Sequence, residues 1–349
     1  MNDNFKKLAK KLESQRSLSL AEYEQLVEAF SPETAAFLAE KADSVRRSVY
    51  GNSVFIRGLI EIGNICKNDC LYCGIRASNK KCERYRLTKE QILACCDEGY
   101  PLGFRTFVLQ GGEDPFFSDE FVCDVVGKIK KRYPDCAVTL SLGERSEESY
   151  RAMRSAGADR YLLRHETATK EHYELLHPHG MSFDNRVKCL ETLKNLGFQT
   201  GCGFMVGSPY QTAAHIAADL KFIEKFRPQM CGIGPFIPHK DTPFADKTAG
   251  TAELTCYLLS IVRLMLPQVL LPATTALGSI RQGGREEGIK AGANVVMPNL
   301  SPNETKEKYM LYNNKLSSGS EAAANVAALA KQMEAVGYRI VTDRGDYKA

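Results

Sequence analysis

The chain has 349 residues, of which 44% are hydrophobic and 25% charged, a composition typical of a globular protein that buries a large core. The formal net charge is only +4 and like charges do not cluster, which argues against nucleic acid or an acidic membrane as a partner. No apolar stretch is long enough to span a membrane and no signal peptide is visible, so we expect a cytoplasmic protein with reduced cysteines.

The first 50 residues predict a helical extension. Ser19 and Glu22 have the spacing of a capping box, in which two side chains satisfy the first backbone N–H groups of a helix. Ser31 followed by Pro32 fits an N-cap with proline at the first helical position. Apolar residues then recur at helical spacing as far as Gly51, where the last helix of the extension should end.

Eight short apolar runs follow from Val54 onward, and helix-like segments lie between them. The runs are VFIRGLIEI, RTFVLQ, AVTLSL, RYLLRH, TGCGFMV, QMCGIG, LLPATT and ANVVM. The clearest helical segments are Lys89–Glu98, Asp119–Tyr133, Glu147–Ser155, Phe183–Leu196, Thr212–Phe226 and Leu254–Leu266. Eight βα units without a Rossmann glycine fingerprint favour an α/β fold, a complete (β/α)8 TIM barrel over residues 51–312. A C-terminal helix, Glu321 to Val336, and a polar tail complete residues 313–349.

A cluster of cysteines follows the first predicted strand, in EIGNICKNDCLYCG. Cys66, Cys70 and Cys73 have the spacing C-x3-C-x2-C, on the face where such barrels place their chemistry. A 4Fe–4S cluster normally takes four thiolates, so three leave one iron open. An open iron can chelate the amino and carboxylate groups of S-adenosylmethionine (SAM) and deliver an electron to its sulfonium. Cleavage then gives methionine and the 5′-deoxyadenosyl radical, and we predict a radical SAM enzyme.

Two other interpretations of these cysteines stay open. They could be ordinary loop thiols, or Cys82 could join them as the fourth ligand of a structural zinc site. The strand context and the aromatic Tyr72 just before the last cysteine favour the cluster. The other cysteines lack such spacing and are expected to be small buried apolar residues, so one cluster is predicted.

Polar residues occupy the strand face that should point into the barrel. In RYLLRHE, Arg164 and Glu166 share a face with Arg160, and in VTLSL Ser141 points away from the leucines. Charges buried in a filled barrel would cost several kcal/mol each unless paired. We therefore expect a hollow barrel in which Arg164 and Glu166 meet a ligand, the alternative being an Arg–Glu pair at the rim.

Further ligand contacts are predicted near the cysteines. In LQGGEDP, Gly111 and Gly112 would let the backbone approach a substrate closely. Glu113 could accept hydrogen bonds from the SAM ammonium, and Arg186 could bind the SAM carboxylate bidentately. The alternative for Glu113 is a carboxylate that only forms part of a turn, and the alternative for Arg186 is a charge on the protein surface.

Several longer strings accompany the cysteine loop. They are LQGGEDP, TLSLGE, YLLRHETA, SFDNR, GIGPFIPH, PATTALG and GANVVMPN. Together with the cysteines, these strings resemble the HydE family of FeFe-hydrogenase maturases. The resemblance extends from about Val54 to Tyr312, and the family belongs to the biotin-synthase-like radical SAM enzymes. The resemblance implies a complete barrel and a role in building the diiron subcluster of the hydrogenase H-cluster. The family is thought to act on an iron–cysteine–carbonyl–cyanide species made by HydG and to pass its product to HydF.

The resemblance also assigns roles to individual residues. The SAM contacts would be Tyr72 (beside the cluster), Gly112, Glu113, Ser141, Glu166 and Arg186. The substrate contacts would be an anion site of Arg164, Thr274 and Thr275, with Met297, Tyr309 and Tyr312 at the far end of the cavity. Some members carry a second iron–sulfur site near the C-terminus, but no cysteine follows Cys256 here, so that site should be absent.

Two rival functions remain. Another biotin-synthase-like radical enzyme, such as a methylornithine synthase, would act on an amino acid, and Arg164 with the threonine pair would serve an amino-acid carboxylate equally well. A non-catalytic carrier of metal clusters is the second rival, although a carrier would have little need for a hollow polar-lined barrel.

Overall fold

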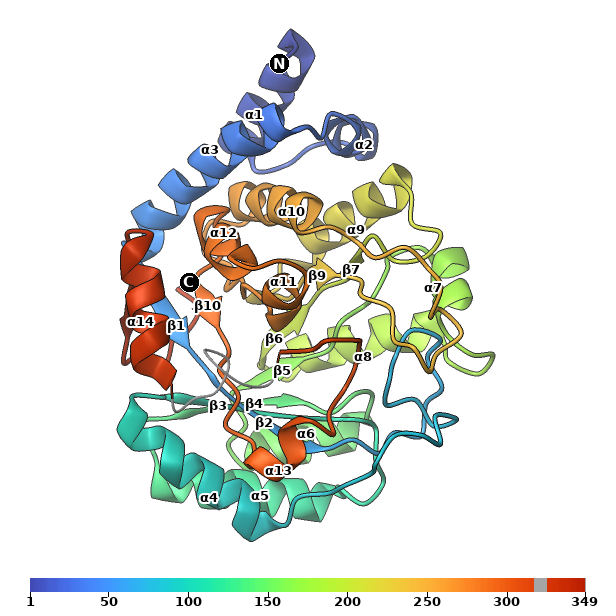
Figure 1. Cartoon of the computed structure of the whole chain (residues 1–349), viewed down its shortest axis with the longest axis vertical. Coiled ribbons are helices and arrows are strands. Elements are labelled where there is room, and N and C mark those ends of the chain that lie inside the picture. The colour runs from blue at the N-terminus through green and yellow to red at the C-terminus, as the bar shows by residue number, and fades with distance from the viewer. Residues whose placement is uncertain (317–324, 349) are drawn as a thin grey trace.

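The computed structural model describes residues 1–316 and 325–348 (Figure 1). Three helices form the N-terminal extension: α1 (Asp3–Gln15), α2 (Leu20–Glu28) and α3 (Pro32–Tyr50). The predicted capping box at Ser19 and Glu22 is complete, and Ser31 caps α3 ahead of Pro32. The extension is not detached, because α2 packs on α9 (Ala213–Phe226) and α3 packs on α10 (Ala252–Met265).

A six-stranded parallel sheet forms the centre of the molecule. Its strands, in spatial order, are β2 (Gly58–Gly63), β3 (Thr106–Gly111), β4 (Ala137–Ser141), β5 (Arg160–Leu162), β6 (Gln199–Cys202) and β8 (Met230–Cys231). Gln110 pairs in register with Ser141, and Leu162 with Gly201. Because all six strands run in the same direction, their carboxyl ends meet at one edge, where the loops that follow them converge.

Shorter strands surround this sheet. β1 (Ser53–Ile56) pairs with both β10 (Val295–Val296) and β11 (Arg339–Val341), and β7 (Met205–Val206) pairs with β9 (Gly234–Pro235). The predicted strand LLPATT makes only single bridges, from Leu270 to Met230 and from Pro272 to Val295. Proline lacks the N–H group that a ladder needs, so the run does not extend into a strand. The α/β fold with a parallel sheet is confirmed, whereas the continuous sheet has six strands and not eight.

Helices surround the strands in Figure 1, although the short helix near β9 lies toward the centre. Those predicted are present within one or two residues, as α4 (Lys89–Gly99), α5 (Asp119–Arg132), α6 (Glu147–Ser155), α8 (Phe183–Asn195), α9 and α10. Between the runs LLPATT and ANVVM, where the sequence shows no clear helical segment, the chain forms two short helices, α11 (Thr275–Ile280) and α12 (Gly284–Lys290). The helices α7 (Lys170–Leu176) and α13 (Asn303–Lys306) and the 3₁₀ turn η1 (Tyr100–Leu102) were not predicted. The C-terminal helix is α14 (Val326–Ala335); residues 321–324 of the predicted segment lie outside the described residues.

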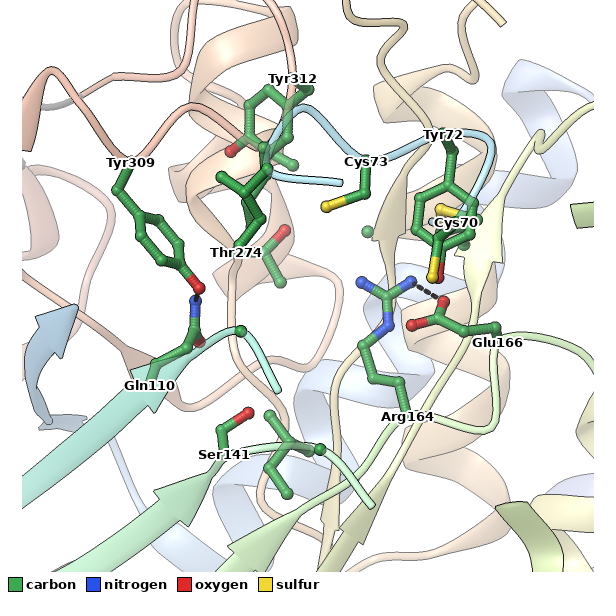
Figure 2. A pocket seen from close by; sticks show the side chains of 18 of the residues that line it. Cys70, Tyr72, Cys73, Gln110, Ser141, Arg164, Glu166, Thr274, Tyr309 and Tyr312 are labelled. Carbon is green, nitrogen blue, oxygen red and sulfur yellow. Dashed lines mark hydrogen bonds and ion pairs between the residues drawn. The ribbon is translucent and has the colours of Figure 1, made fainter. Parts of the chain in front are cut away.

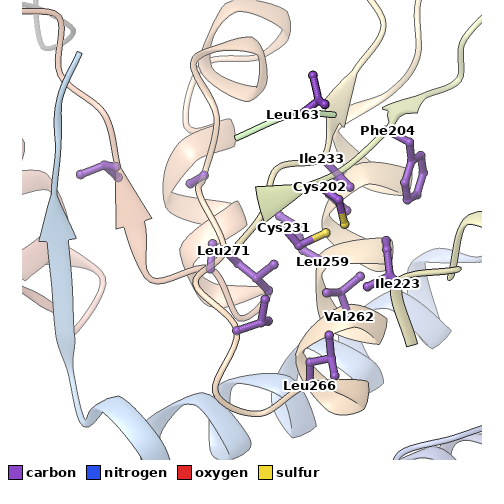
Figure 3. Packing of buried hydrophobic residues seen from close by; sticks show 14 of the residues in the cluster. Leu163, Cys202, Phe204, Ile223, Cys231, Ile233, Leu259, Val262, Leu266 and Leu271 are labelled. Atoms are coloured by element: carbon purple, nitrogen blue, oxygen red, sulfur yellow. The ribbon is translucent and has the colours of Figure 1, made fainter. Parts of the chain in front are cut away.

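The hydrophobic core fills the layer between strands and helices. Figure 3 shows Cys202 and Cys231, on neighbouring strands, facing Ile223 of α9 and Val262 of α10. Both cysteines are fully buried, as predicted for small apolar residues. No helix in the described part of the chain is long and apolar enough to cross a membrane.

Candidate functional site

A cavity of about 340 Å³ opens at the carboxyl ends of the strands (Figure 2). The cavity is lined by every residue that was predicted to hold the cluster, SAM or the substrate: Cys66, Cys70, Tyr72, Cys73, Gly112, Glu113, Ser141, Arg164, Glu166, Arg186, Thr274, Thr275, Met297, Tyr309 and Tyr312. These residues come from the loops after β2 and β3, from the end of β4, from the segment after β5, from α8, from the start of α11 and from residues 297–312. The cavity therefore joins the predicted cluster, SAM and substrate residues in one space.

The cysteine loop (residues 64–88) connects β2 to α4, and its three predicted ligands are free thiols. Burial raises the pKa of each thiol, that of Cys73 to about 12. The pKa of Cys70 is raised well above its usual value by burial and by the charges of Cys73 and Cys66. Three buried thiolates close to one another are stable only with positive charge beside them. The iron ions of an iron–sulfur cluster supply that charge. The donor set therefore fits the predicted cluster.

Cys82, the fourth ligand of the zinc alternative, does not line the cavity. Its sulfur accepts a hydrogen bond from Asn64 Nδ2 at 3.5 Å. Among the described residues, no three His, Cys, Asp or Glu side chains converge closely enough to hold a single metal ion. The geometry does not favour a mononuclear zinc site built from these four cysteines.

Two glycines allow the cysteine loop to pack tightly. A Cβ on Gly112 would lie 2.3 Å from the carbonyl oxygen of Ile65 and 2.7 Å from Cys66 Cβ. A Cβ on Gly74 would lie 2.1 Å from the carbonyl oxygen of Met310. The sequence suggested that the glycine pair admits a substrate, but the close approach at Gly112 is to the backbone of the cysteine loop.

Arg164 and Glu166 form an ion pair inside the cavity, with Arg164 Nη2 2.9 Å from Glu166 Oε2 (Figure 2). Glu166 has a φ of 67°, a conformation that is uncommon outside glycine and often marks functional sites. Figure 2 shows the guanidinium beneath Cys70 and Tyr72. Among the described residues, Arg164 Nε and Thr274 Oγ1 are buried without a hydrogen-bond partner. Because buried polar groups are normally hydrogen-bonded, these atoms are suited to a ligand.

Glu144 joins the predicted SAM residues and was not identified from the sequence. Its Oε1 accepts a hydrogen bond from Arg186 Nε at 2.5 Å, and its backbone N–H donates to Glu113 Oε1 at 2.9 Å. Arg186 also donates from Nη1 to the carbonyl oxygen of Arg164 at 2.9 Å. Arg186 is therefore a buried link between elements, and its alternative as a surface charge is wrong.

A second polar wall, also missed from the sequence, lies around Glu61. Its Oε1 accepts from Lys315 Nζ at 2.6 Å and its Oε2 from Asn299 Nδ2 at 2.9 Å. Burial raises the pKa of Glu61, while Lys315 and Asn299 act against that rise. Nearby, Gln110 Nε2 lies 3.4 Å from the Tyr309 hydroxyl, and Lys315 Nζ lies 5.2 Å from the centre of the Tyr309 ring (Figure 2 shows Gln110 and Tyr309). A strap of residues 308–315 thus closes one side of the cavity.

The hydroxyl of Tyr72 is hydrogen-bonded to His177, which directly follows α7. His177 Nδ1 lies 2.9 Å from the Tyr173 carbonyl oxygen and so donates to it, leaving Nε2 to accept from the Tyr72 hydroxyl at 3.1 Å. Burial lowers the pKa of His177 to about 3, so the imidazole stays neutral at physiological pH.

Comparison with known proteins gives a consistent result. Residues 60–223 match the Radical SAM superfamily. The chain is 44% identical over 328 residues to the FeFe hydrogenase maturase subunit HydE of Thermotoga maritima, and the match covers 93% of each chain. It is 29% identical over 343 residues to the 3-methylornithine synthase of Methanosarcina barkeri, covering 97% of this chain and 94% of that one.

Two solved structures share the fold. The crystal structure of methylornithine synthase (PylB) superposes with a TM-score of 0.84 at 26% identity, covering 96% of this chain and 97% of that one. The crystal structure of HydG, a maturase of the FeFe-hydrogenase, superposes with a TM-score of 0.79 at 20% identity, covering 97% and 76%. At that identity the second match indicates the fold alone.

Proposed function

Because the chain belongs to the HydE family of FeFe-hydrogenase maturases, which are radical SAM enzymes, we propose that it acts on a small iron–cysteine complex with carbonyl and cyanide ligands. The product would enter the diiron subcluster of the hydrogenase H-cluster. The cofactors of the enzyme are a 4Fe–4S cluster and SAM. Together they supply reductive cleavage of SAM to methionine and a 5′-deoxyadenosyl radical.

Three thiols and a ring of polar groups would hold the cofactors. In this proposal Cys66, Cys70 and Cys73 ligate the cluster, supported by their common position on the cavity wall. The SAM contacts would be Tyr72, Gly112, Glu113, Ser141, Glu166 and Arg186. Glu144 would orient this set, because it bonds to both Glu113 and Arg186.

The observation that carries the substrate assignment is the pair of unpartnered polar atoms on Arg164 and Thr274. A carboxylate or cyanide end of the substrate would satisfy both atoms, with Thr275 beside them. Met297, Tyr309 and Tyr312 would enclose the rest of the substrate. Enclosure excludes water, which protects a reactive intermediate from side reactions.

We further propose that the strands close into a complete (β/α)8 barrel over residues 51–312. Single parallel bridges support closure, because they continue from β8 through Leu270, Pro272 and Val295 and reach β2 at the Leu59–Asn299 bridge. HydG is the proposed source of the substrate and HydF the proposed acceptor of the product.

Cleavage of SAM tests the cofactor site. Protein purified without oxygen and loaded with iron and sulfide should form 5′-deoxyadenosine when a reductant and SAM are added. Cys70→Ser should abolish product and lower the iron content, because the cluster loses a ligand. Cys82→Ser is the matched control and should retain both, since Cys82 lies off the cavity. Equal loss in the two variants, or none in Cys70→Ser, would contradict the ligand assignment.

Activation of a hydrogenase apoprotein tests the substrate. The chain, mixed with HydF, HydG and SAM, should restore hydrogen evolution. Arg164→Met should reduce activation at least tenfold while SAM still binds, whereas Arg105→Met, ahead of β3 at the other end of the sheet, should not. Methylornithine formed from lysine, with no activation of hydrogenase, would instead favour the amino-acid enzyme.

A further inference from the structure

Arg84 donates four hydrogen bonds to backbone carbonyl groups of the cysteine loop. Its Nη1 donates to the carbonyl oxygens of Asn64 at 2.5 Å and Ile75 at 2.8 Å. Its Nη2 donates to the carbonyl oxygens of Arg76 at 2.6 Å and Asn79 at 3.0 Å. Asn64 precedes the three cysteines and the other acceptors follow them, so one guanidinium joins both ends of the segment that carries the ligands.

The charge of Arg84 is not neutralised within the described part of the chain. Its four acceptors are carbonyl groups, and no carboxylate forms an ion pair with it. The neighbouring arginines differ, because Arg76 pairs with Asp69 and Arg86 pairs with Asp114. A net positive charge therefore remains at Arg84, whose guanidinium is bonded to the backbone on both sides of the three cysteines.

We propose that Arg84 is a positioning residue for the cluster, which sets the path of the cysteine loop and raises the reduction potential of the bound cluster through its uncompensated charge. The proposal rests on the proposed function for the presence of the cluster. Reduction adds one negative charge, and a cation nearby in a medium of low dielectric favours the reduced state. Net charge and hydrogen bonding around a cluster are established determinants of its potential. The rigid fork of arginine suits this task, because it can bind four carbonyls without a counter-ion.

Three variants separate charge from shape. Arg84→Gln removes the charge, Arg84→Lys keeps it without the four-bond fork, and Lys80→Gln removes an exposed charge from the same loop. The readout is redox titration of the loaded protein, followed by electron paramagnetic resonance. At a fixed potential, Arg84→Gln should lower the ratio of reduced to oxidised cluster about tenfold, which is about 59 mV for a one-electron couple. Arg84→Lys should stay within about twofold of wild type, and Lys80→Gln should not differ, because water and salt screen its charge.

Each outcome decides a different claim. A wild-type chain that forms no 4Fe–4S signal would overturn the proposed function itself. A loaded Arg84→Gln protein with the wild-type potential would overturn only the role of Arg84. Should Arg84→Gln bind no iron, the lysine variant decides, and a tenfold fall in its reduced fraction would show that the charge is not the cause.

Discussion

Tyr72 and His177 form a contact between the cysteine loop and α7 that fixes an aromatic ring on the cavity wall. The hydroxyl of Tyr72 donates to a histidine nitrogen that cannot protonate near neutral pH, because burial lowers the pKa of His177 to about 3. The acceptor is therefore available at every pH at which the enzyme would work. A neutral, immobile acceptor positions the tyrosine without adding charge beside the cluster.

His177→Phe removes this acceptor and tests the contact. We expect the KM for SAM to rise about threefold to tenfold with little change in kcat, since a lost hydrogen bond of about 1 kcal/mol would loosen the ring and not the chemistry. Tyr173→Phe is the control, because the Tyr173 hydroxyl has no hydrogen-bond partner among the described residues. Steady-state assays of 5′-deoxyadenosine measure both values. A fall in kcat at constant KM would refute the positioning role.

Individual site residues could be predicted where a local sequence pattern determines which face of a strand carries the side chain. Alternation along the predicted strand RYLLRHE placed Arg164 and Glu166 on the inner face, and both line the cavity. Alternation along the first predicted strand, VFIRGLIEI, places Glu61 on the same face as Leu59. The position of Glu61 on the cavity wall could therefore have been predicted from the sequence. Lys315 could not, because it meets Glu61 across 254 residues and no local pattern reports such a pairing.

At the scale of elements, the cysteine loop and the strap of residues 308–315 depend on each other. The backbone N–H of Gly74 donates to the carbonyl oxygen of Leu311 at 2.9 Å, and a Cβ on Gly74 would lie 2.1 Å from the carbonyl oxygen of Met310. A side chain at Gly74 would also lie 2.6 Å from a ring carbon of His239. Met310 lies in the strap between Tyr309 and Leu311, which both line the cavity, so the loop and the strap pack as one unit.

Gly74→Ala should push the cysteine loop away from the strap of residues 308–315. We expect a destabilisation of about 1–3 kcal/mol, as for other overpacked sites, together with reduced iron content. Gly127→Ala is the matched control: it lies inside α5 with no atom near its added methyl group, and should stabilise the protein by about 0.5–1 kcal/mol. Urea unfolding and iron analysis measure both effects. A Gly74→Ala protein as stable and as iron-rich as wild type would show that the packing is looser than the structure indicates.

Elements with strong local signals were predicted well, and those without them were not. The predicted caps at Ser19 and Ser31 both occur, at the starts of α2 and α3. In contrast, β11 has three residues and owes its existence to pairing with β1. Likewise α7 has seven residues and no side-chain cap, so packing rather than local sequence determines it.

The whole molecule is closed at the end opposite the cavity by its last residues. Arg160, whose side chain is fully buried, donates to Asp346 Oδ1 at 2.6 Å, and Arg344 donates to Asp346 Oδ2 at 2.7 Å. The sequence placed Arg160 on the same inner face as Arg164, yet the two serve different ends of the interior. The sequence predicted only that the tail is polar; in the structure its Arg344 and Asp346 bond to Asp159 and Arg160 at the start of β5.

Asp346→Asn should weaken this closure. Burial would raise the pKa of Asp346, but its bonds to Arg344 and Arg160 outweigh burial and lower it. A lowered pKa in the folded state means that the contribution is present above the unfolded pKa, about 3.9, and is lost as the pH falls below it. We expect the variant to be about 1–2 kcal/mol less stable at pH 7, a modest value because Asp346 is partly exposed.

Unfolding measured at several pH values checks this expectation. The stability gap between wild type and Asp346→Asn should be constant from pH 7 to about pH 5 and should narrow below about pH 4. Asp343→Asn, at an exposed site in the same tail, should show no such gap. A gap that widens on acidification would contradict the assigned charge state.

The strap and the tail carry a consequence for the order in which the protein is made. Synthesis proceeds from the N-terminus, and the cysteine loop leaves the ribosome long before Lys315 or Asp346 has been joined to the chain. Until then Glu61 lacks its cation, Gly74 has no strap against it, and Arg160 lacks the tail carboxylate. We therefore expect iron and sulfide to enter only after these late residues have joined the fold, so that the cell's loading machinery meets a folded site and not a nascent one.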